Sequence, residues 1–164
     1  MLLARKSSST KILRTVLTLA GFGKVVSVDE PAYAIELLRS EHFHAVFMEG
    51  TMEHEGMPFA LAARRLPALI NPMIVMFAVF PEARKRDVEA ARDLGVHDVI
   101  CRPVSPKTVM AKLGAALAAP RPFIAAPSFF GPDRRSKSRT GSQILGQERR
   151  ARTAKKTRMP VPLI

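Results

Sequence analysis

Short apolar runs alternate with segments of helical periodicity throughout residues 1–119, and this alternation restricts the possible folds more than any other feature. A run without polar alternation is typical of a strand covered on both faces, as in a parallel sheet flanked by helices. Five such strand-and-helix units predict a doubly wound α/β domain over residues 1–119. We expect its strands at residues 2–4, 24–28, 45–48, 73–77 and 96–101.

The boundaries between these runs carry residue types that begin and end helices. The hydroxyl run at residues 7–10 predicts a cap for the first helix, although hydroxyls at a helix N-terminus also suit a bound phosphate. Gly95 suits the end of a helix over residues 82–94. Pro106 suits the first turn of a last helix that runs to about residue 118. The polar stretch 49–58 is predicted to be a loop.

The formal net charge of +12 lies mostly in the C-terminal part of the 164-residue chain. Of the 26 Lys and Arg residues, 11 follow Pro120, where Asp133 and Glu148 are the only acidic residues. Because apolar residues are sparse there, residues 120–164 are predicted to be a basic, disordered extension. Residues 123–130 are the exception, since their aromatic side chains would either fold back onto the domain or serve as a docking motif.

The remaining composition predicts a cytoplasmic protein. No segment has the roughly 18 uninterrupted apolar residues that a membrane span requires. The N-terminus also lacks the apolar stretch of a secretory signal. The single cysteine, Cys101, excludes an internal disulfide, and its apolar neighbours predict a buried thiol.

Several local motifs in this arrangement resemble those of the bacterial response-regulator receiver domain over about the first 120 residues. The tail segments 121–123 and 129–135 also resemble extensions on some single-domain receivers. The resemblance implies a flavodoxin-like sheet with strand order 2-1-3-4-5. The motifs within the domain are Ala20-Gly21-Phe22, Met52 after the third strand, Gly95-Val96-His97-Asp98 and Arg102-Pro103-Val104-Ser105-Pro106.

In working receivers, an Asp after the third strand accepts a phosphoryl group with the help of Mg²⁺, which an acidic pair after the first strand holds. A Lys and a Thr or Ser bind the phosphoryl oxygens, and an aromatic residue on strand five accompanies the hydroxyl. The resemblance places the acceptor on Glu49 and the acidic pair on Ala4 and Arg5. It places the hydroxyl on Phe77, the aromatic residue on Val99 and the Lys on Arg102.

None of these positions keeps the chemistry of its role. The extra methylene of Glu49 displaces the carboxylate by more than about 1 Å, enough to spoil an in-line attack. A methyl group at Ala4 and a cation at Arg5 remove the oxygen ligands of a hard cation, so Mg²⁺ is not expected. Phe77 has no hydroxyl, and Arg102 keeps the charge of a Lys without its point-charge geometry.

These substitutions lead to two interpretations of Glu49. In the first, Glu49 pairs with Arg5 or Arg102, whose guanidinium stands where Mg²⁺ or Lys would be. Removing one partner of such a pair, if buried, would cost roughly 3–5 kcal/mol. In the second, Glu49 imitates a phosphorylated Asp and holds the domain active.

The leading functional prediction is therefore a phosphorylation-independent adaptor, and not an enzyme, in a two-component (phosphorelay) pathway. The resemblance implies that partner proteins use the face formed by residues 82–118. His42, His44 and His54 lie near acidic residues but lack the spacing of zinc ligands, so no metal site is expected.

Two other functions remain open. One is a phosphoacceptor with an unorthodox site. The other is a nucleic-acid-associated protein that binds phosphates through its basic tail, and such binding would be electrostatic and salt-sensitive. The tail cations available for such contact are Arg134, Arg135, Arg149, Arg150, Arg152, Lys155, Lys156 and Arg158.

Overall fold

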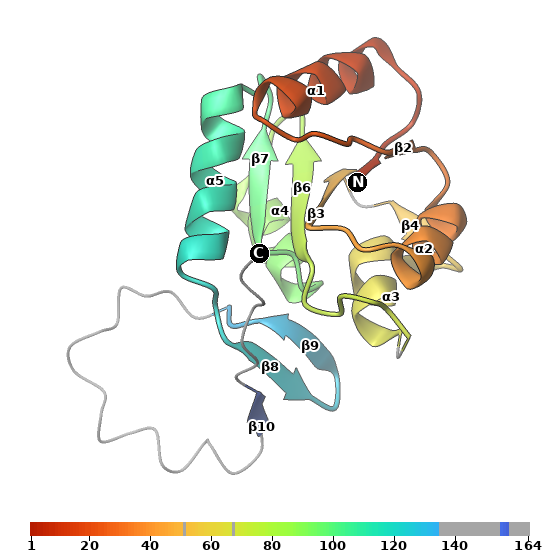
Figure 1. The fold of residues 1–164 in the computed structure, drawn as a ribbon. Coiled ribbons are helices and arrows are strands. Elements are labelled where there is room, and N and C mark those ends of the chain that lie inside the picture. Colours follow the sequence, from red (N-terminus) through yellow and green to blue (C-terminus); the bar gives the residue numbers. More distant parts are fainter. Residues whose placement is uncertain (51, 67, 135–154, 158–164) are drawn as a thin grey trace, which may run out of the picture.

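The computed structural model describes residues 1–50, 52–66, 68–134 and 155–157. Its centre is a five-stranded parallel sheet in the order β2-β1-β3-β6-β7 (Figure 1). With β6 and β7 as the fourth and fifth expected strands, this is the predicted flavodoxin-like order 2-1-3-4-5. The strands are β1 (Leu2–Leu3), β2 (Ser27–Val28), β3 (Ala45–Glu49), β6 (Val75–Phe80) and β7 (Asp98–Cys101).

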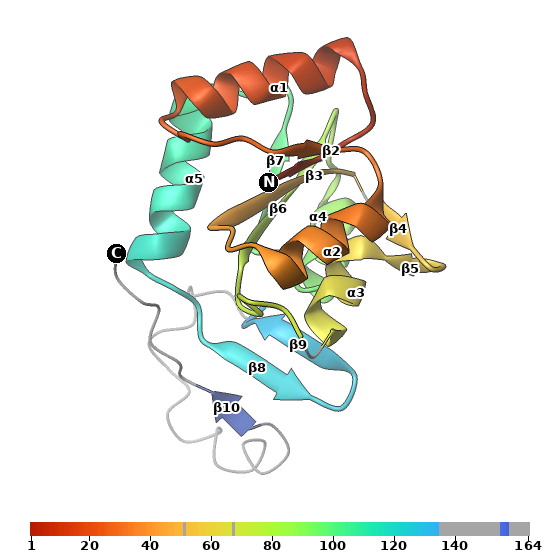
Figure 2. The ribbon, with the colours of Figure 1, turned by 45° about the vertical axis from the view of Figure 1, so that its right-hand side comes forward.

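Helices cover both faces of the sheet (Figure 2). The helices α1 (Ser8–Leu19) and α5 (Pro106–Ala118) pack on one face. The helices α2 (Pro31–Ser40), α3 (Phe59–Arg65) and α4 (Lys85–Asp93) pack on the other. The fold is therefore a three-layered, doubly wound α/β domain, as the alternation of runs predicts.

The apolar runs are continuous because each strand supplies both cores. Phe47 belongs to the cluster beneath α1 and α5, whereas its neighbours Val46 and Met48 belong to the cluster beneath α2, α3 and α4. Successive side chains of a strand point to opposite faces of the sheet, so a strand buried on both faces has no polar position.

The helix boundaries follow the predicted signals. Ser7 caps α1 through its hydroxyl, which accepts a hydrogen bond from the backbone N–H of Thr10 at 3.2 Å. The hydroxyl of Ser105 caps α5 in the same way, at 3.1 Å from the N–H of Thr108. The capping interpretation of residues 7–10 is thus the one that the structure adopts.

Two local predictions were wrong. The polar stretch 49–58 contains a small antiparallel hairpin, β4 (Glu53–His54) and β5 (Met57–Pro58). Its turn includes Glu55, which has a positive φ of 51°. Glutamate rarely adopts this conformation, so the sequence did not indicate the turn. Cys101 is exposed, because it is the last residue of β7 and β7 is an edge strand.

The C-terminal extension contributes a second sheet. The strands β8 (Phe123–Ala126) and β9 (Phe129–Pro132) form an antiparallel hairpin, and β10 (Lys155–Thr157) pairs with the other edge of β8. Phe123 is 5% exposed, so the hairpin folds back onto the domain and is not a free docking motif. The predicted boundary at residue 119 is therefore too early. The predicted disorder of residues 135–154 and 158–164 lies outside the described residues.

No helix in the described part of the chain is both long enough and apolar enough to span a bilayer.

Candidate functional site

The carboxyl ends of the parallel strands meet at one edge of the sheet, where the predicted pocket residues lie. Glu49 is the last residue of β3, and the N–H of the next residue, Gly50, donates to the carbonyl of Val79 at 2.8 Å. Arg102 directly follows β7, and its N–H donates to the carbonyl of Phe80 at 3.0 Å. Backbone hydrogen bonds to β6 therefore hold both residues beside each other.

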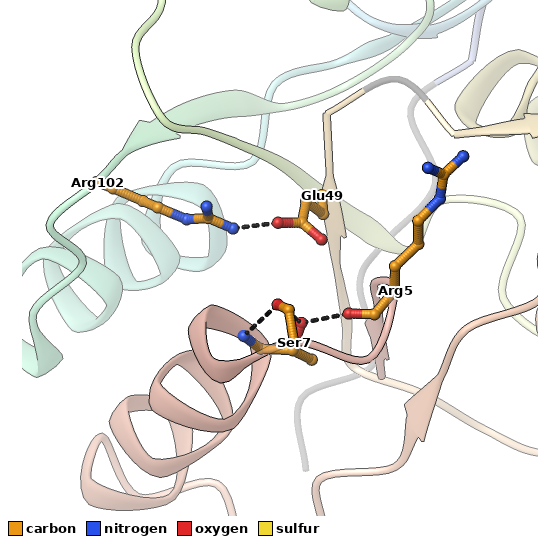
Figure 3. A network of polar contacts seen from close by, with 5 residues as sticks. Arg5, Ser7, Glu49 and Arg102 are labelled. Carbon is orange, nitrogen blue, oxygen red and sulfur yellow. Dashed lines mark hydrogen bonds and ion pairs between the residues drawn. The ribbon is translucent and has the colours of Figure 1, made fainter.

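Glu49 and Arg102 form an ion pair across this edge. A guanidinium N–H of Arg102 donates to Oε1 of Glu49 (Figure 3). Of the two arginines that the sequence offered as partners, the structure selects Arg102. The side chains of Glu49 and Arg102 are 26% and 27% exposed, so the pair is partly hydrated. The expected cost of breaking it therefore falls from the buried range to about 1 kcal/mol or less.

Arg5 does not join the pair. Its backbone carbonyl accepts a hydrogen bond from the hydroxyl of Thr10, and its side chain extends away from Glu49 (Figure 3). The side chain lines a hollow of about 650 Å³, together with Glu49 and the acidic residues Asp29 and Glu53. Arg5 thus places a cation in a hollow that is otherwise acidic.

The residues at the acidic-pair positions do not fit a divalent cation. Ala4 is buried, and its N–H donates to the carbonyl of Val28 at 2.9 Å, while Arg5 adds a positive charge. Neither side chain supplies the oxygen ligands that Mg²⁺ requires. Over the described ranges, no group of three or more His, Cys, Asp or Glu side chains is arranged to hold a metal ion.

Phe77, the residue that the resemblance places at the hydroxyl position, pairs with Phe47 in the sheet register. It lies in the middle of β6, fully buried, and its ring stacks on that of Phe47 with centroids 5.1 Å apart. The residue opposite Glu49 in the sheet register is Val79. β6 runs to Phe80, so this strand continues beyond its predicted end at residue 77. Val79 also lacks a hydroxyl, so this side of the pocket has none.

Val99 and the three histidines do not form a common site. Val99 is buried in β7, opposite Ala78. His42 and His44 precede β3 and contact each other edge to face, with ring centroids 5.1 Å apart. His54 lies in β4, beyond the other end of β3, and its Nε2 is 3.9 Å from a carboxylate oxygen of Glu55. The fold therefore separates His54 from the other two histidines.

The sequence analysis missed a buried polar cluster at the opposite edge of the sheet. Arg64, at the end of α3, is 4% exposed and donates hydrogen bonds to three backbone carbonyls. The acceptors are Gly95 at 3.2 Å, and Pro72 and Ile74 at 2.7 Å each. One signal was available, because Arg64 follows the inward-facing Ala60 at helical spacing.

The same cluster holds His97 and Phe123. The Arg64 guanidinium lies over the Phe123 ring at 5.0 Å, and the His97 and Phe123 rings are 5.7 Å apart. Nδ1 of His97 accepts a hydrogen bond from the N–H of Met76 at 3.2 Å, which favours the neutral imidazole. Burial, together with the charges of Arg64 and Arg121, lowers the pKa of His97 to about 3. This cluster anchors the hairpin to the domain.

Of the tail cations, Arg134 is the one whose side chain is described. It pairs with Asp93 at the end of α4 and lies over the Phe129 ring at 4.4 Å, so it belongs to the folded domain. Lys155 and Lys156 belong to β10. The other predicted contacts, Arg135, Arg149, Arg150, Arg152 and Arg158, lie outside the described residues, so the nucleic-acid alternative stays a prediction.

The sequence matches no family model and no curated protein. Solved structures do match. A response regulator from Desulfuromonas acetoxidans superposes with a TM-score of 0.62 at 20% identity, over 72% of this chain and 94% of that one. The receiver domain of the sensor histidine kinase PA1611 from Pseudomonas aeruginosa, solved with magnesium in its active-site cleft, has a TM-score of 0.60 at 15% identity, over 72% and 95%.

The domain has the receiver fold. A CheY-like receiver domain protein from Methanospirillum hungatei also has this fold, with a TM-score of 0.57 at 15% identity over 71% of this chain and 90% of that one. Identities this low establish the fold alone. The function of this receiver-fold chain therefore has to follow from its own residues.

Proposed function

We propose that this protein is a receiver-fold adaptor of two-component signalling that works by binding other proteins, without phosphorylation and without Mg²⁺. The observation that carries the proposal is the ion pair between Glu49 and Arg102 at the carboxyl edge of the sheet. It engages the carboxylate at the acceptor position with a permanent cation, which is an arrangement for structure and not for group transfer.

The chemistry of phosphoryl transfer supports this proposal. Attack by a carboxylate needs an oxygen aligned with the phosphorus and a metal that neutralises the transferring charge. Here an oxygen of Glu49 accepts a hydrogen bond from Arg102, and Ala4 supplies no ligand. Val79, opposite Glu49, has no hydroxyl with which to detect a phosphoryl group. We therefore propose that the pocket neither forms nor reads an acyl phosphate.

The surface of α5 supports a role in protein binding. Met110 and Leu117 are 49% and 48% exposed, and they lie seven residues apart on one face of the helix. The residues between them on that face, Ala111 and Gly114, are exposed and carry no charge. An apolar helix face of this kind suits contact with another protein. It lies within the predicted partner-binding segment, residues 82–118.

Amide NMR tests the state of the pocket. The spectrum of the labelled protein is recorded before and after addition of Mg²⁺ and beryllofluoride, a mimic of the acyl phosphate. We expect resonances of Glu49, Val79 and Arg102 to stay in place. The matched variant Ala4→Asp/Arg5→Asp/Glu49→Asp/Arg102→Lys restores carboxylates and a lysine, and should respond. A saturable response of the natural sequence at β6 and β7 would refute the proposal.

Affinity capture from the cells that make the protein tests the partner class. We expect mass spectrometry to identify histidine kinases or their regulators among the captured proteins. The variant Met110→Lys/Leu117→Lys should lose them. The control Tyr33→Lys/Ile70→Lys, at two exposed apolar positions outside α5, should retain them. Equal retention by both variants would remove α5 from the proposal, and capture without any two-component protein would contradict the pathway.

A further inference from the structure

A second cavity lies away from the carboxyl edge of the sheet, beside the base of the hairpin. It has a volume of about 370 Å³, within the lower range for small-molecule sites. Its walls come from the end of α4, the start of β7, the C-terminal half of α5 and the segment that leads into β8. Four cationic side chains line it, namely Arg92, Lys112, Arg121 and Arg134, against the single carboxylate of Asp98.

Two of these cations already have acidic partners. Lys112 donates to a carboxylate oxygen of Asp98 at 2.6 Å, and Arg134 pairs with Asp93. Arg92 and Arg121 are partly buried, and neither takes part in these two ion pairs. Within the described part of the chain, the cavity therefore contains two arginines that lie outside these two ion pairs.

Arg92 provides a second and independent observation. Its Nε is buried from solvent and has no hydrogen-bond partner among the described residues. A buried donor without an acceptor is costly, and a donor that carries charge is more so. Because Nε itself is closed to solvent, a ligand in the cavity would contact the Arg92 guanidinium through its other nitrogens.

Part of the cavity lining is apolar. It consists of the alanines at positions 115, 116, 118 and 119 of α5 and its C-cap, together with the buried Phe77. Small side chains leave a flat surface that accepts a planar or aliphatic group. The cavity thus combines two arginines, which recognise phosphate oxygens in a planar fork, with an apolar wall.

We propose that this cavity binds a small organic phosphate of about nucleotide size. Its phosphate contacts Arg92 and Arg121, and its apolar part lies against α5. This site is separate from the pocket at Glu49 and does not depend on the proposed adaptor function. Because the walls join α4, α5 and the segment before β8, an occupant stabilises their packing and raises the melting temperature.

Isothermal titration calorimetry of the full chain, with inorganic pyrophosphate and adenosine diphosphate as probes at constant ionic strength, tests the proposal. Both probes should bind saturably, and the diphosphate nucleotide should bind more tightly. The variant Arg92→Gln/Arg121→Gln should weaken both probes by about tenfold or more. The control Arg14→Gln/Arg39→Gln removes the same charge from exposed positions on α1 and α2, and should bind as the natural sequence does.

A third variant, Ala115→Leu, narrows the cavity without a change of charge. It should weaken the nucleotide and leave pyrophosphate unaffected, whereas an unchanged nucleotide affinity would overturn the placement of the apolar part on α5. Absence of saturable binding by the natural sequence, or equal weakening in the two double variants, would overturn the site as a whole. Dispersed amide spectra of all variants establish that each is folded.

Discussion

The two edges of the sheet each hold an arginine at a junction between elements, and they differ in access to water. At the carboxyl edge, Arg102 pairs with Glu49, and about a quarter of each side chain is exposed. At the opposite edge, Arg64 is buried, and backbone carbonyls accept its hydrogen bonds. The carboxyl edge holds a partly hydrated ion pair, whereas the other edge holds the buried cation that joins the hairpin to the domain.

The difference shows that the length of an ion-pair contact does not indicate how much that contact stabilises the folded protein. A partly hydrated pair gains little, because water already solvates both ions. A buried guanidinium satisfied by carbonyls is expensive to disturb, since its removal leaves those acceptors without partners. The four predictions that follow test this contrast, from the largest expected effect to the smallest.

Arg64→Met should lower the free energy of unfolding by about 3–5 kcal/mol, because the carbonyls of Gly95, Pro72 and Ile74 lose their donors. Urea denaturation followed by circular dichroism measures the change. The neighbouring Arg65 is exposed, so Arg65→Met should cost a few tenths of a kcal/mol, within roughly 0.5 kcal/mol. Similar losses in the two variants would mean that the buried cation is not what anchors this edge.

Gly131→Ala should lower the free energy of unfolding by about 1–3 kcal/mol. A Cβ at this position would lie 2.8 Å from the Cα of Gly95 and 3.0 Å from a ring carbon of Phe129, so the hairpin would have to move off the domain. Gly114→Ala is the matched control, because its Cβ meets nothing within 4 Å and a helix prefers alanine. A neutral Gly131→Ala would contradict the close docking of the hairpin.

Acid should destabilise the protein through His97. Its pKa is lowered from 6.5 to about 3 in the folded state, so the unfolded chain binds the extra proton between these pH values. The free energy of unfolding should therefore decrease by up to about 1.4 kcal/mol per pH unit as the pH falls from 6.5 towards 3. His97→Gln should flatten this slope relative to the exposed control His42→Gln. A slope unchanged by His97→Gln would show that other groups carry it.

Glu49→Gln should lower the free energy of unfolding by about 1 kcal/mol or less, with a smaller effect at high salt. The changes in amide chemical shift that this variant causes should be confined to residues near Arg102 and the ends of β3 and β6. A loss above about 3 kcal/mol would indicate a buried pair after all. Shifts that spread through β7, α4 and α5 would favour the alternative in which Glu49 imitates a phosphorylated Asp.

The sequence by itself determined the layers of the domain and the neighbours of the site. Continuous apolar runs, hydroxyl caps such as Ser7 and the glycine at position 95 are local signals, and each specifies its own element. The resemblance to receiver domains placed Glu49 near both Arg5 and Arg102, and one of these two proposed pairs is present in the structure. The strand order 2-1-3-4-5, which the resemblance to receiver domains implied, is the order that the structure has.

The tertiary structure alone decided everything that depends on contacts between distant segments. It selected Arg102 over Arg5 as the partner of Glu49, and the pairing of β3 with β6 set Val79 opposite Glu49. It also buried Arg64 beneath Phe123, which lies far along a chain whose composition indicates disorder. Burial is a property of the packed whole, and no local pattern measures which surface a distant hairpin will cover.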